Sequence, residues 1–229
     1  MHTPQLPLSL RFPRGAGFDT FLDPDGSVVD ALAVWTSGGP GSCFLSGPAG
    51  TGKTHLSLAL CGARAEAGEE VAYLPLRDGA AALVAAQAPV KLLVVDDVDA
   101  SLDDDALQRD LFALHNRQLD ASGSIFYTSR SITADWVAGL PDLRSRIEQS
   151  LRLRTPQLAD ADRRRWLERA AVRRGFELDS AAIEFLLRRT ERDLGSLERL
   201  LEDIDRASLA SQRRVTVPFL SAWMASRKA

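Results

Sequence analysis

The sequence of 229 residues contains only two cysteines, Cys43 and Cys61. Two cysteines cannot build a disulfide framework or a multi-cysteine metal cluster, and their scarcity favours a reduced, cytoplasmic protein. Long hydrophobic runs are missing too, because no apolar stretch reaches the roughly 18 residues that a membrane-spanning helix needs. Pro4, Pro7 and Pro13 interrupt the first residues and exclude the apolar core of a signal peptide. We therefore expect no membrane partner.

A strong net charge is also absent, since 28 basic and 31 acidic residues leave a net charge of −3. The charge is unevenly distributed: residues 1–150 carry 11 Lys and Arg against 19 Asp and Glu, and residues 151–229 carry 17 against 12. A basic second part could face nucleic acid or an acidic partner. Its arginines are interleaved with acids at helical spacing, however, which favours a solvated helical surface.

The most specific motif lies between Cys43 and His55 and has the pattern G-x-x-x-x-G-K-T of a phosphate-binding loop. Its glycines allow backbone N–H groups to approach phosphate oxygens, Lys53 reaches the β- and γ-phosphates, and the Thr54 hydroxyl binds Mg²⁺. The apolar residues before the loop predict a strand, and residues 53–65 predict a helix whose N-terminus faces the same anion. The predicted nucleotide-binding residues are Gly47, Pro48, Ala49, Gly50, Thr51, Gly52, Lys53, Thr54 and His55.

A second informative stretch is the apolar run from Lys91 that ends in Asp96 and Asp97. On its own, this pattern fits a simple turn at the end of a strand. Following a phosphate loop, it indicates a Walker B element, in which Asp96 holds Mg²⁺ and Asp97 orients or deprotonates the attacking water.

The remaining pattern predicts alternating strands and helices, followed by helices alone. We expect strands near residues 43, 71, 91, 124 and 150, with helices at about 27–35, 53–65, 79–87, 106–121 and from residue 140. After Pro156 the expected helices span about 159–174, 180–190, 193–210 and 217–226. The predicted fold class is α/β, a parallel sheet with helices on both faces (residues 16–155), followed by a small α-helical lid domain (residues 156–229).

The first fifteen residues look separate from this fold. Leu6, Leu8 and Leu10 alternate with other residues, as in an extended segment with one apolar side. Such a peptide suits a groove on a partner protein, or it covers its own domain, and the composition does not decide between these.

The order of the motifs resembles that of the AAA+ ATPases. The motifs are the phosphate loop, the Asp-Asp strand end, a polar strand end at Ser129, the Leu-Arg-Ser-Arg run at 143–146 and the helical lid. The residues of these motifs are similar to those of the replication initiator DnaA and its relatives. Because the sequence ends after the lid, without a helix-turn-helix domain, it is similar to the Hda branch, which regulates DnaA.

The resemblance implies specific roles. Gln5, Leu6, Leu8 and Leu10 would bind the DNA polymerase sliding clamp, and through it the chain would reach DNA indirectly. Ser129 takes the sensor-1 position, and Arg146 matches the arginine finger that reaches the ATP site of DnaA. The chain would thus stimulate hydrolysis of DnaA-bound ATP and inactivate the initiator. Without the resemblance, Arg146 would be interpreted as a surface arginine paired with a neighbouring acid.

One position departs from the DnaA pattern: Gly195 stands where the lid carries a sensor-2 arginine, and Arg192 and Arg199 are the nearest arginines that could replace it. The resemblance implies ADP or ATP with Mg²⁺ as ligands and weak intrinsic ATPase activity. The working nucleotide, homo-oligomer formation and direct DNA contact by the lid remain open. The alternative functions are an AAA+ helicase loader and a small-molecule P-loop kinase.

Overall fold

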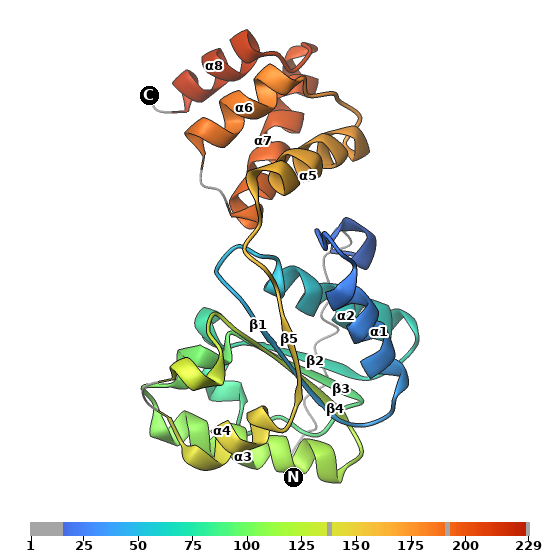
Figure 1. The fold of residues 1–229 in the computed structure, drawn as a ribbon, viewed down its shortest axis with the longest axis vertical. Coiled ribbons are helices and arrows are strands. Elements are labelled where there is room, and N and C mark those ends of the chain that lie inside the picture. Colours follow the sequence, from blue (N-terminus) through green and yellow to red (C-terminus); the bar gives the residue numbers. More distant parts are fainter. Residues whose placement is uncertain (1–15, 137–138, 191–192, 228–229) are drawn as a thin grey trace, which may run out of the picture.

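The computed structural model describes residues 16–136, 139–190 and 193–227. A helix-covered sheet forms one part of the molecule, and four helices form a second part beyond the carboxyl ends of the strands (Figure 1). The predicted clamp-binding residues Gln5, Leu6, Leu8 and Leu10 lie outside the described residues. Within the described residues, no helix is long and apolar enough to cross a membrane.

The sheet is parallel throughout, and its five strands have the order β2-β3-β4-β1-β5. The central strands are buried along their whole length, as expected for a parallel sheet covered on both faces. Strand β1, which leads into the phosphate loop, lies between β4 and β5. The strands are β1 (Ser42–Ser46), β2 (Val71–Pro75), β3 (Leu92–Asp96), β4 (Ser124–Ser129) and β5 (Leu151–Arg154).

Each face of the sheet has its own hydrophobic core, because successive side chains of a strand point to opposite faces. Cys43 and Leu45 pack under α1 (Ser27–Ser37) and α2 (Lys53–Glu66). Phe44, between them, packs under α3 (Asp105–Asp120) and α4 (Pro141–Glu148) on the other face (Figure 1). The predicted α/β class is confirmed by this arrangement.

The four remaining helices pack around two connected apolar clusters. Three of the helices begin with a side-chain cap, in which Asp179, Asp193 or Thr216 accepts a hydrogen bond from a backbone N–H of the first turn. These helices are α5 (Asp160–Arg173), α6 (Ser180–Arg189), α7 (Leu194–Ser211) and α8 (Val217–Ser226).

Several arginines of this helical part form ion pairs on the surface. Arg165 contacts Asp162 at 2.7 Å, and Arg188 contacts Glu184 at 3.0 Å, both within one turn of a helix. These pairs agree with the interpretation of the basic second part as a solvated helical surface. Exposed pairs of this kind stabilise a fold by only about 0.2–1 kcal/mol each.

The helix predicted for residues 79–87 is wrong. The short 3-10 turn Leu76–Asp78 precedes this segment, and a second one, Ala80–Leu83, occupies its start. Gly79 between them has a φ of 90°, which interrupts a right-handed helix, and Pro89 disfavours helical backbone at Ala88 before it. Alanine content alone predicted a helix here, and that local signal does not account for the left-handed backbone of Gly79. Further 3-10 turns span Phe18–Thr20, Val98–Ser101 and Thr133–Asp135.

Candidate functional site

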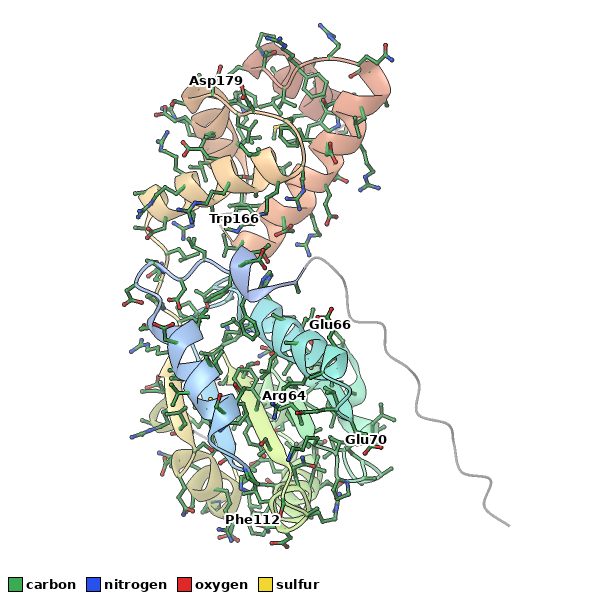
Figure 2. All side chains as sticks on the ribbon, turned by 90° about the vertical axis from the view of Figure 1, so that its right-hand side faces the viewer. Arg64, Glu66, Glu70, Phe112, Trp166 and Asp179 are labelled. Carbon is green, nitrogen blue, oxygen red and sulfur yellow. The ribbon has the colours of Figure 1, made fainter. Side chains whose placement is uncertain are left out.

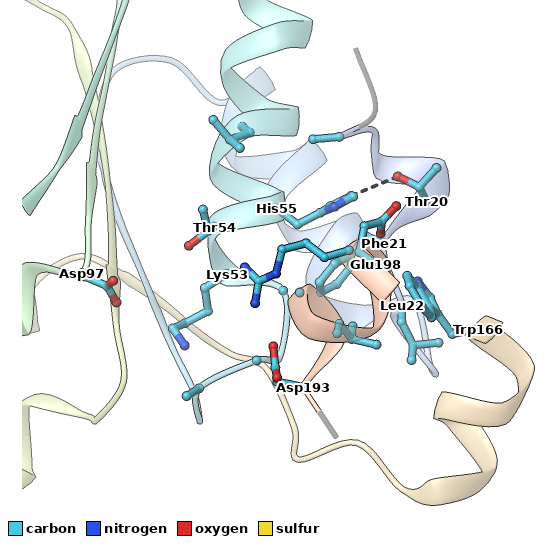
Figure 3. A pocket seen from close by; sticks show the side chains of 18 of the residues that line it. Thr20, Phe21, Leu22, Lys53, Thr54, His55, Asp97, Trp166, Asp193 and Glu198 are labelled. Atoms are coloured by element: carbon cyan, nitrogen blue, oxygen red, sulfur yellow. Dashed lines mark hydrogen bonds between the residues drawn. The ribbon is translucent and has the colours of Figure 1, made fainter. Parts of the chain in front are cut away.

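A cavity of about 660 Å³ lies where the phosphate loop, residues 16–22 and the helical part meet (Figure 3). The carboxyl ends of β1, β2, β3 and β4 supply one wall, and the first turns of α7 supply the other. This is the edge of an open parallel sheet where ligands bind in α/β proteins. Side chains that line the cavity include Thr20, Lys53, Thr54, His55, Asp97 and Glu198.

Gly50 joins the phosphate loop to the start of α7. Its carbonyl oxygen accepts a hydrogen bond of 3.1 Å from the Leu194 N–H, and its φ is 73°. A Cβ atom at this position would lie 2.1 Å from the Cβ of Asp193, the residue that caps α7. Only glycine fits this contact, for reasons of both backbone conformation and space.

Lys53 extends along the inside of the phosphate loop. Its Nζ donates hydrogen bonds to the carbonyl oxygens of Gly47 at 2.7 Å and Pro48 at 2.8 Å. Burial lowers the pKa of Lys53, and the carboxylates of Asp97 and Asp96 act in the opposite direction. A phosphate group in the loop would offer this ammonium group a stronger, charged acceptor.

Thr54 and Asp96 form an oxygen pair beside the loop. The Thr54 hydroxyl donates to Asp96 Oδ2 at 2.8 Å, and the hydroxyls of Tyr73, Ser57 and Thr128 donate to the same carboxylate. Across the described residues, no group of three or more His, Cys, Asp or Glu side chains could hold a metal. The pair nevertheless fits Mg²⁺, which proteins bind through one or two carboxylates while substrate phosphates and water complete the octahedron.

Asp97, which follows Asp96, is held by two arginines. Its Oδ2 lies 3.2 Å from Arg77 Nε, and its Oδ1 lies 3.8 Å from Arg130 Nε. Asp97 has a left-handed backbone with a φ of 55°, and its N–H donates to Thr128 Oγ1 at 2.8 Å. The pKa of Asp97 is raised, because burial and the neighbouring Asp96 outweigh the opposite effect of Arg77. Asp97 also lines the cavity, and its role in orienting a water molecule stays a prediction.

The comparisons with known proteins agree with this geometry. Residues 160–224 match the family model of the Hda lid domain. The fold is similar to domain III of the replication initiator DnaA from Thermotoga maritima, with a TM-score of 0.75, 19% identity, and coverage of 91% of this chain and 95% of that one. It is also similar to AMPPCP-bound DnaA from Aquifex aeolicus, with a TM-score of 0.66, 20% identity, and coverage of 84% and 66% respectively. The Thermotoga maritima RuvB branch migration motor gives a TM-score of 0.65, 19% identity, and coverage of 94% and 73%.

The chain has the AAA+ fold of these proteins, and its residues 160–224 match the Hda lid domain. The resemblance predicted from the sequence motifs is thereby confirmed for the fold and for the lid.

In the AAA+ core, Ser129 does not line the cavity. It is buried, its hydroxyl donates to the Ser131 carbonyl at 2.7 Å, and its own carbonyl accepts from the Gly47 N–H at 3.1 Å. Ser129 therefore holds the first residue of the phosphate loop. The hydroxyl nearest to the Walker B acids belongs instead to Thr128, one residue earlier.

His55 faces away from the phosphate loop toward residues 16–22. Its Nε2 lies 3.0 Å from Thr20 Oγ1 and 2.8 Å from the Gly17 carbonyl, and its ring lies 6.2 Å from that of Phe21 (Figure 3). Leu22, which follows, packs against the apolar cluster of the lid. This contact places the segment between the AAA+ core and the lid, beside the cavity.

Gly195 lies in the first turn of α7 and lines the cavity without a side chain. Arg199, one turn later, also lines the cavity, and its Nη2 hydrogen-bonds the Ser196 hydroxyl at 3.1 Å. Arg192 lies outside the described residues. The lid thus offers one arginine to the cavity among the described residues, together with Asp193, Glu198 and Glu202.

Arg146 lies far from this cavity. It is exposed on α4, which ends where β5 begins, and the Ser150 hydroxyl just after the helix donates to Ser42 at the start of β1 at 2.8 Å. The phosphate loop follows the other end of β1, about 16 Å away for a strand of this length. The ring centroid of Phe112 lies 5.9 Å from the Arg146 guanidinium carbon. Figure 2 shows Phe112 at the opposite end of the core from Trp166, which lines the cavity.

The two arginines of the Leu-Arg-Ser-Arg run differ in their contacts. Arg144 Nε lies 3.0 Å from Glu148 Oε1, an ion pair within one turn of α4. For Arg146, the described part of the chain shows no ion pair, and its contact with Phe112 is an exposed cation–π interaction worth about 0.5–1 kcal/mol. The surface-pair interpretation therefore fits Arg144, whereas Arg146 is available to a partner.

The sequence reasoning missed Arg77 and Arg130. Each follows the carboxyl end of a strand, Arg77 after β2 and Arg130 after β4. The signal that could have found them is this position, because the carboxyl ends of neighbouring parallel strands meet at the ligand-binding edge.

Proposed function

We propose that this chain regulates the initiation of chromosome replication. In this proposal residues 1–15 bind the DNA polymerase sliding clamp, residues 16–155 hold a nucleotide, and residues 156–229 cover it as the lid. Arg146 enters the ATP site of DnaA and stimulates hydrolysis of the bound ATP, which leaves the initiator in its inactive ADP form. One observation carries the proposal: Arg146 is exposed, unlike the paired Arg144, and lies at the end of the sheet remote from its own phosphate loop.

The chemistry of the side chain supports this role. A guanidinium group is always charged and presents planar donors, which match the charge that spreads over the equatorial oxygens of a transferred phosphoryl group. Arg146 cannot provide these donors to its own cavity, because the length of the sheet separates the two. It can provide them only to a second molecule.

The chain's own cavity is proposed to bind ADP or ATP with Mg²⁺. Lys53 and the loop N–H groups would hold the phosphates, and Thr54 and Asp96 would hold the ion. Two solved structures with the same fold are named as DnaA bound to AMPPCP. We expect slow intrinsic turnover, because Asp97 is paired with arginines and Gly195 offers no side chain to a phosphate.

The proposal is tested by loading DnaA with labelled ATP and following its conversion to ADP. The chain should accelerate conversion only when sliding clamp loaded on DNA is present. Equal conversion with and without the chain would refute the regulatory function.

The clamp contact can be tested separately. The double variant Gln5→Ala/Leu6→Ala should lose clamp binding by at least about 100-fold, because it removes the polar anchor and part of the alternating apolar side. Calorimetric titration against purified clamp measures this, with thermal unfolding as the control for an intact fold. Undiminished affinity would contradict the proposed tail and would favour a helicase loader, which has no use for it.

Nucleotide should stabilise the fold by mass action, by about 2.7 kcal/mol at a free ligand concentration of 100 times Kd. Lys53→Ala should remove most of the thermal shift that ADP or ATP with Mg²⁺ produces, since the buried ammonium group lies within the loop. Rapid turnover of ATP by the wild-type chain alone would contradict the view that its catalysis takes place at the partner's site.

A further inference from the structure

A separate cavity, lined by residues of the lid alone, lies between α6 and α8. Its volume is about 560 Å³, and we refer to it as the α6/α8 groove. It shares no described residue with the cavity beside the phosphate loop. Helix α8 lies at the end of the lid away from the sheet (Figure 1), so the groove is remote from the proposed nucleotide site. Its lining includes Phe185, Arg189, Leu200, Trp223, Met224 and Arg227.

The floor of the groove is apolar and rests on the core of the lid. Phe185, Trp223 and Met224 are half-buried and pack against the second of the two apolar clusters. Leu200 of α7 is also half-buried and contacts both clusters. Partly exposed apolar side chains that gather in a concavity are typical of a binding site and not of a solvated helical surface.

Two arginines lie over the aromatic rings of this floor. The guanidinium carbon of Arg189 lies 4.1 Å from the ring centroid of Phe185, and that of Arg227 lies 4.9 Å from the ring of Trp223. Each arginine follows its aromatic residue by one turn, the spacing at which side chains of a helix meet. The rings hold the guanidinium groups in place, so little conformational freedom is lost when a partner binds them.

The rim of the groove is positively charged. No carboxylate belongs to its lining within the described residues. For Arg189 the described part of the chain shows no ion pair, whereas Arg188, the residue before it, is paired with Glu184 at 3.0 Å. Arg227 lies 2.5 Å from Asp203, but this carboxylate also binds a second arginine and is thereby neutralised. An acidic group on a partner would complement this rim.

We propose that the α6/α8 groove is a docking site for an acidic peptide segment of a partner protein. The segment places an apolar side chain against the two aromatic rings and its carboxylates against Arg189 and Arg227. The composition of the lining favours a protein over a nucleic acid. The cores of protein interfaces are enriched in aromatic residues, Met and Arg and depleted in Lys, Asp and Glu, as this lining is. Interfaces with nucleic acid are more polar and carry far more positive charge.

The test selects peptides from a random library on the immobilised wild-type chain, with the Arg189→Glu variant as the counter-selection. Peptides that bind only the wild type should combine Asp or Glu with an aromatic or large aliphatic residue. One enriched peptide, made with a fluorescent label, is then titrated with the chain and followed by fluorescence anisotropy. Its affinity should fall as the salt concentration rises, because salt screens the exposed charges of the rim.

Arg189→Glu and Arg227→Gln should each lower the affinity for the labelled peptide by about tenfold or more, the range for loss of a charged hydrogen bond. Arg188→Glu is the matched control, because it reverses the same charge one residue earlier, outside the lining of the groove. It should change the affinity by less than about threefold, as exposed surface charges do. Thermal unfolding of each variant checks that the fold is intact.

Three results would overturn the inference. The first is a selection that enriches no peptide over the Arg189→Glu variant, or that enriches peptides without acidic residues. The second is displacement of the labelled peptide by single-stranded oligothymidylate at lower concentrations than by the unlabelled peptide, which would assign the groove to nucleic acid. The third is dimerisation of the wild type in sedimentation that Arg189→Glu abolishes and Arg188→Glu does not, which would assign the groove to a second copy of the chain.

Discussion

Replacing Arg146 with alanine should abolish the stimulation of ATP hydrolysis on DnaA and leave the chain folded, clamp-bound and able to bind its own nucleotide. An arginine finger supplied by a partner is worth about 10³–10⁵ in rate in well-studied systems, so loss near this scale is expected. The side chain is exposed on α4 and lies over the ring of Phe112, so its removal should leave the core of the sheet unchanged.

The measurement follows the loss of labelled ATP from DnaA with loaded clamp. Arg144→Ala is the matched control, because Arg144 lies two residues away on the same helix but is paired with Glu148. Arg146→Lys should not restore activity, since an ammonium group has a shorter reach and no planar fork. Full activity of Arg146→Ala would disprove the assignment. If Arg144→Ala is inactive and Arg146→Ala is active, the arginine finger is Arg144, two residues earlier.

Replacing Gly50 with alanine should destabilise the protein by about 2–5 kcal/mol. A residue with a Cβ in the left-handed region is strained by about 1–2 kcal/mol, and overpacking adds about 1–3 kcal/mol. The overpacking arises because the new Cβ would lie 2.1 Å from the Cβ of Asp193 and would separate the phosphate loop from α7. The free energy of unfolding, measured with denaturant, reports the change, and nucleotide affinity should fall with it.

Gly68 offers the matched control for this prediction. Its φ of 80° is close to that of Gly50, but no atom lies within 4 Å of the position of a Cβ. Gly68→Ala should therefore cost only the backbone strain of about 1–2 kcal/mol. Equal destabilisation of the two variants would show that the contact between the loop and the lid contributes nothing.

The features that the sequence predicted well depend on residues that are close together in the chain. Strand β3 was predictable because it is a continuous apolar run, and the phosphate loop because its glycines and Lys53 stand at fixed offsets. Helix α8, from Val217 to Ser226, matched its prediction because Thr216 caps it and Pro218 follows in the first turn.

The features that it did not predict depend on contacts between distant segments. Arg77 and Asp97 are 20 positions apart and meet only because β2 and β3 are neighbours in the sheet. The direction of the Ser129 hydroxyl depends on Ser131 after the strand, and the crowding at Gly50 depends on Asp193 in the lid. Neither periodicity nor spacing encodes such pairings.

The separation of Arg146 from the phosphate loop means that two opposite ends of the molecule carry different groups. Two AAA+ modules that meet finger to phosphate loop are related by a head-to-tail step, and a two-fold axis cannot generate that contact. Each such step leaves one donor end and one acceptor end free, so a row of modules has two unlike termini. If Arg146 acts as the proposed finger, this chain would occupy the acceptor terminus alone. The rate of hydrolysis that it stimulates would then depend on how many rows of initiators are present. It would not depend on how many initiators each row contains.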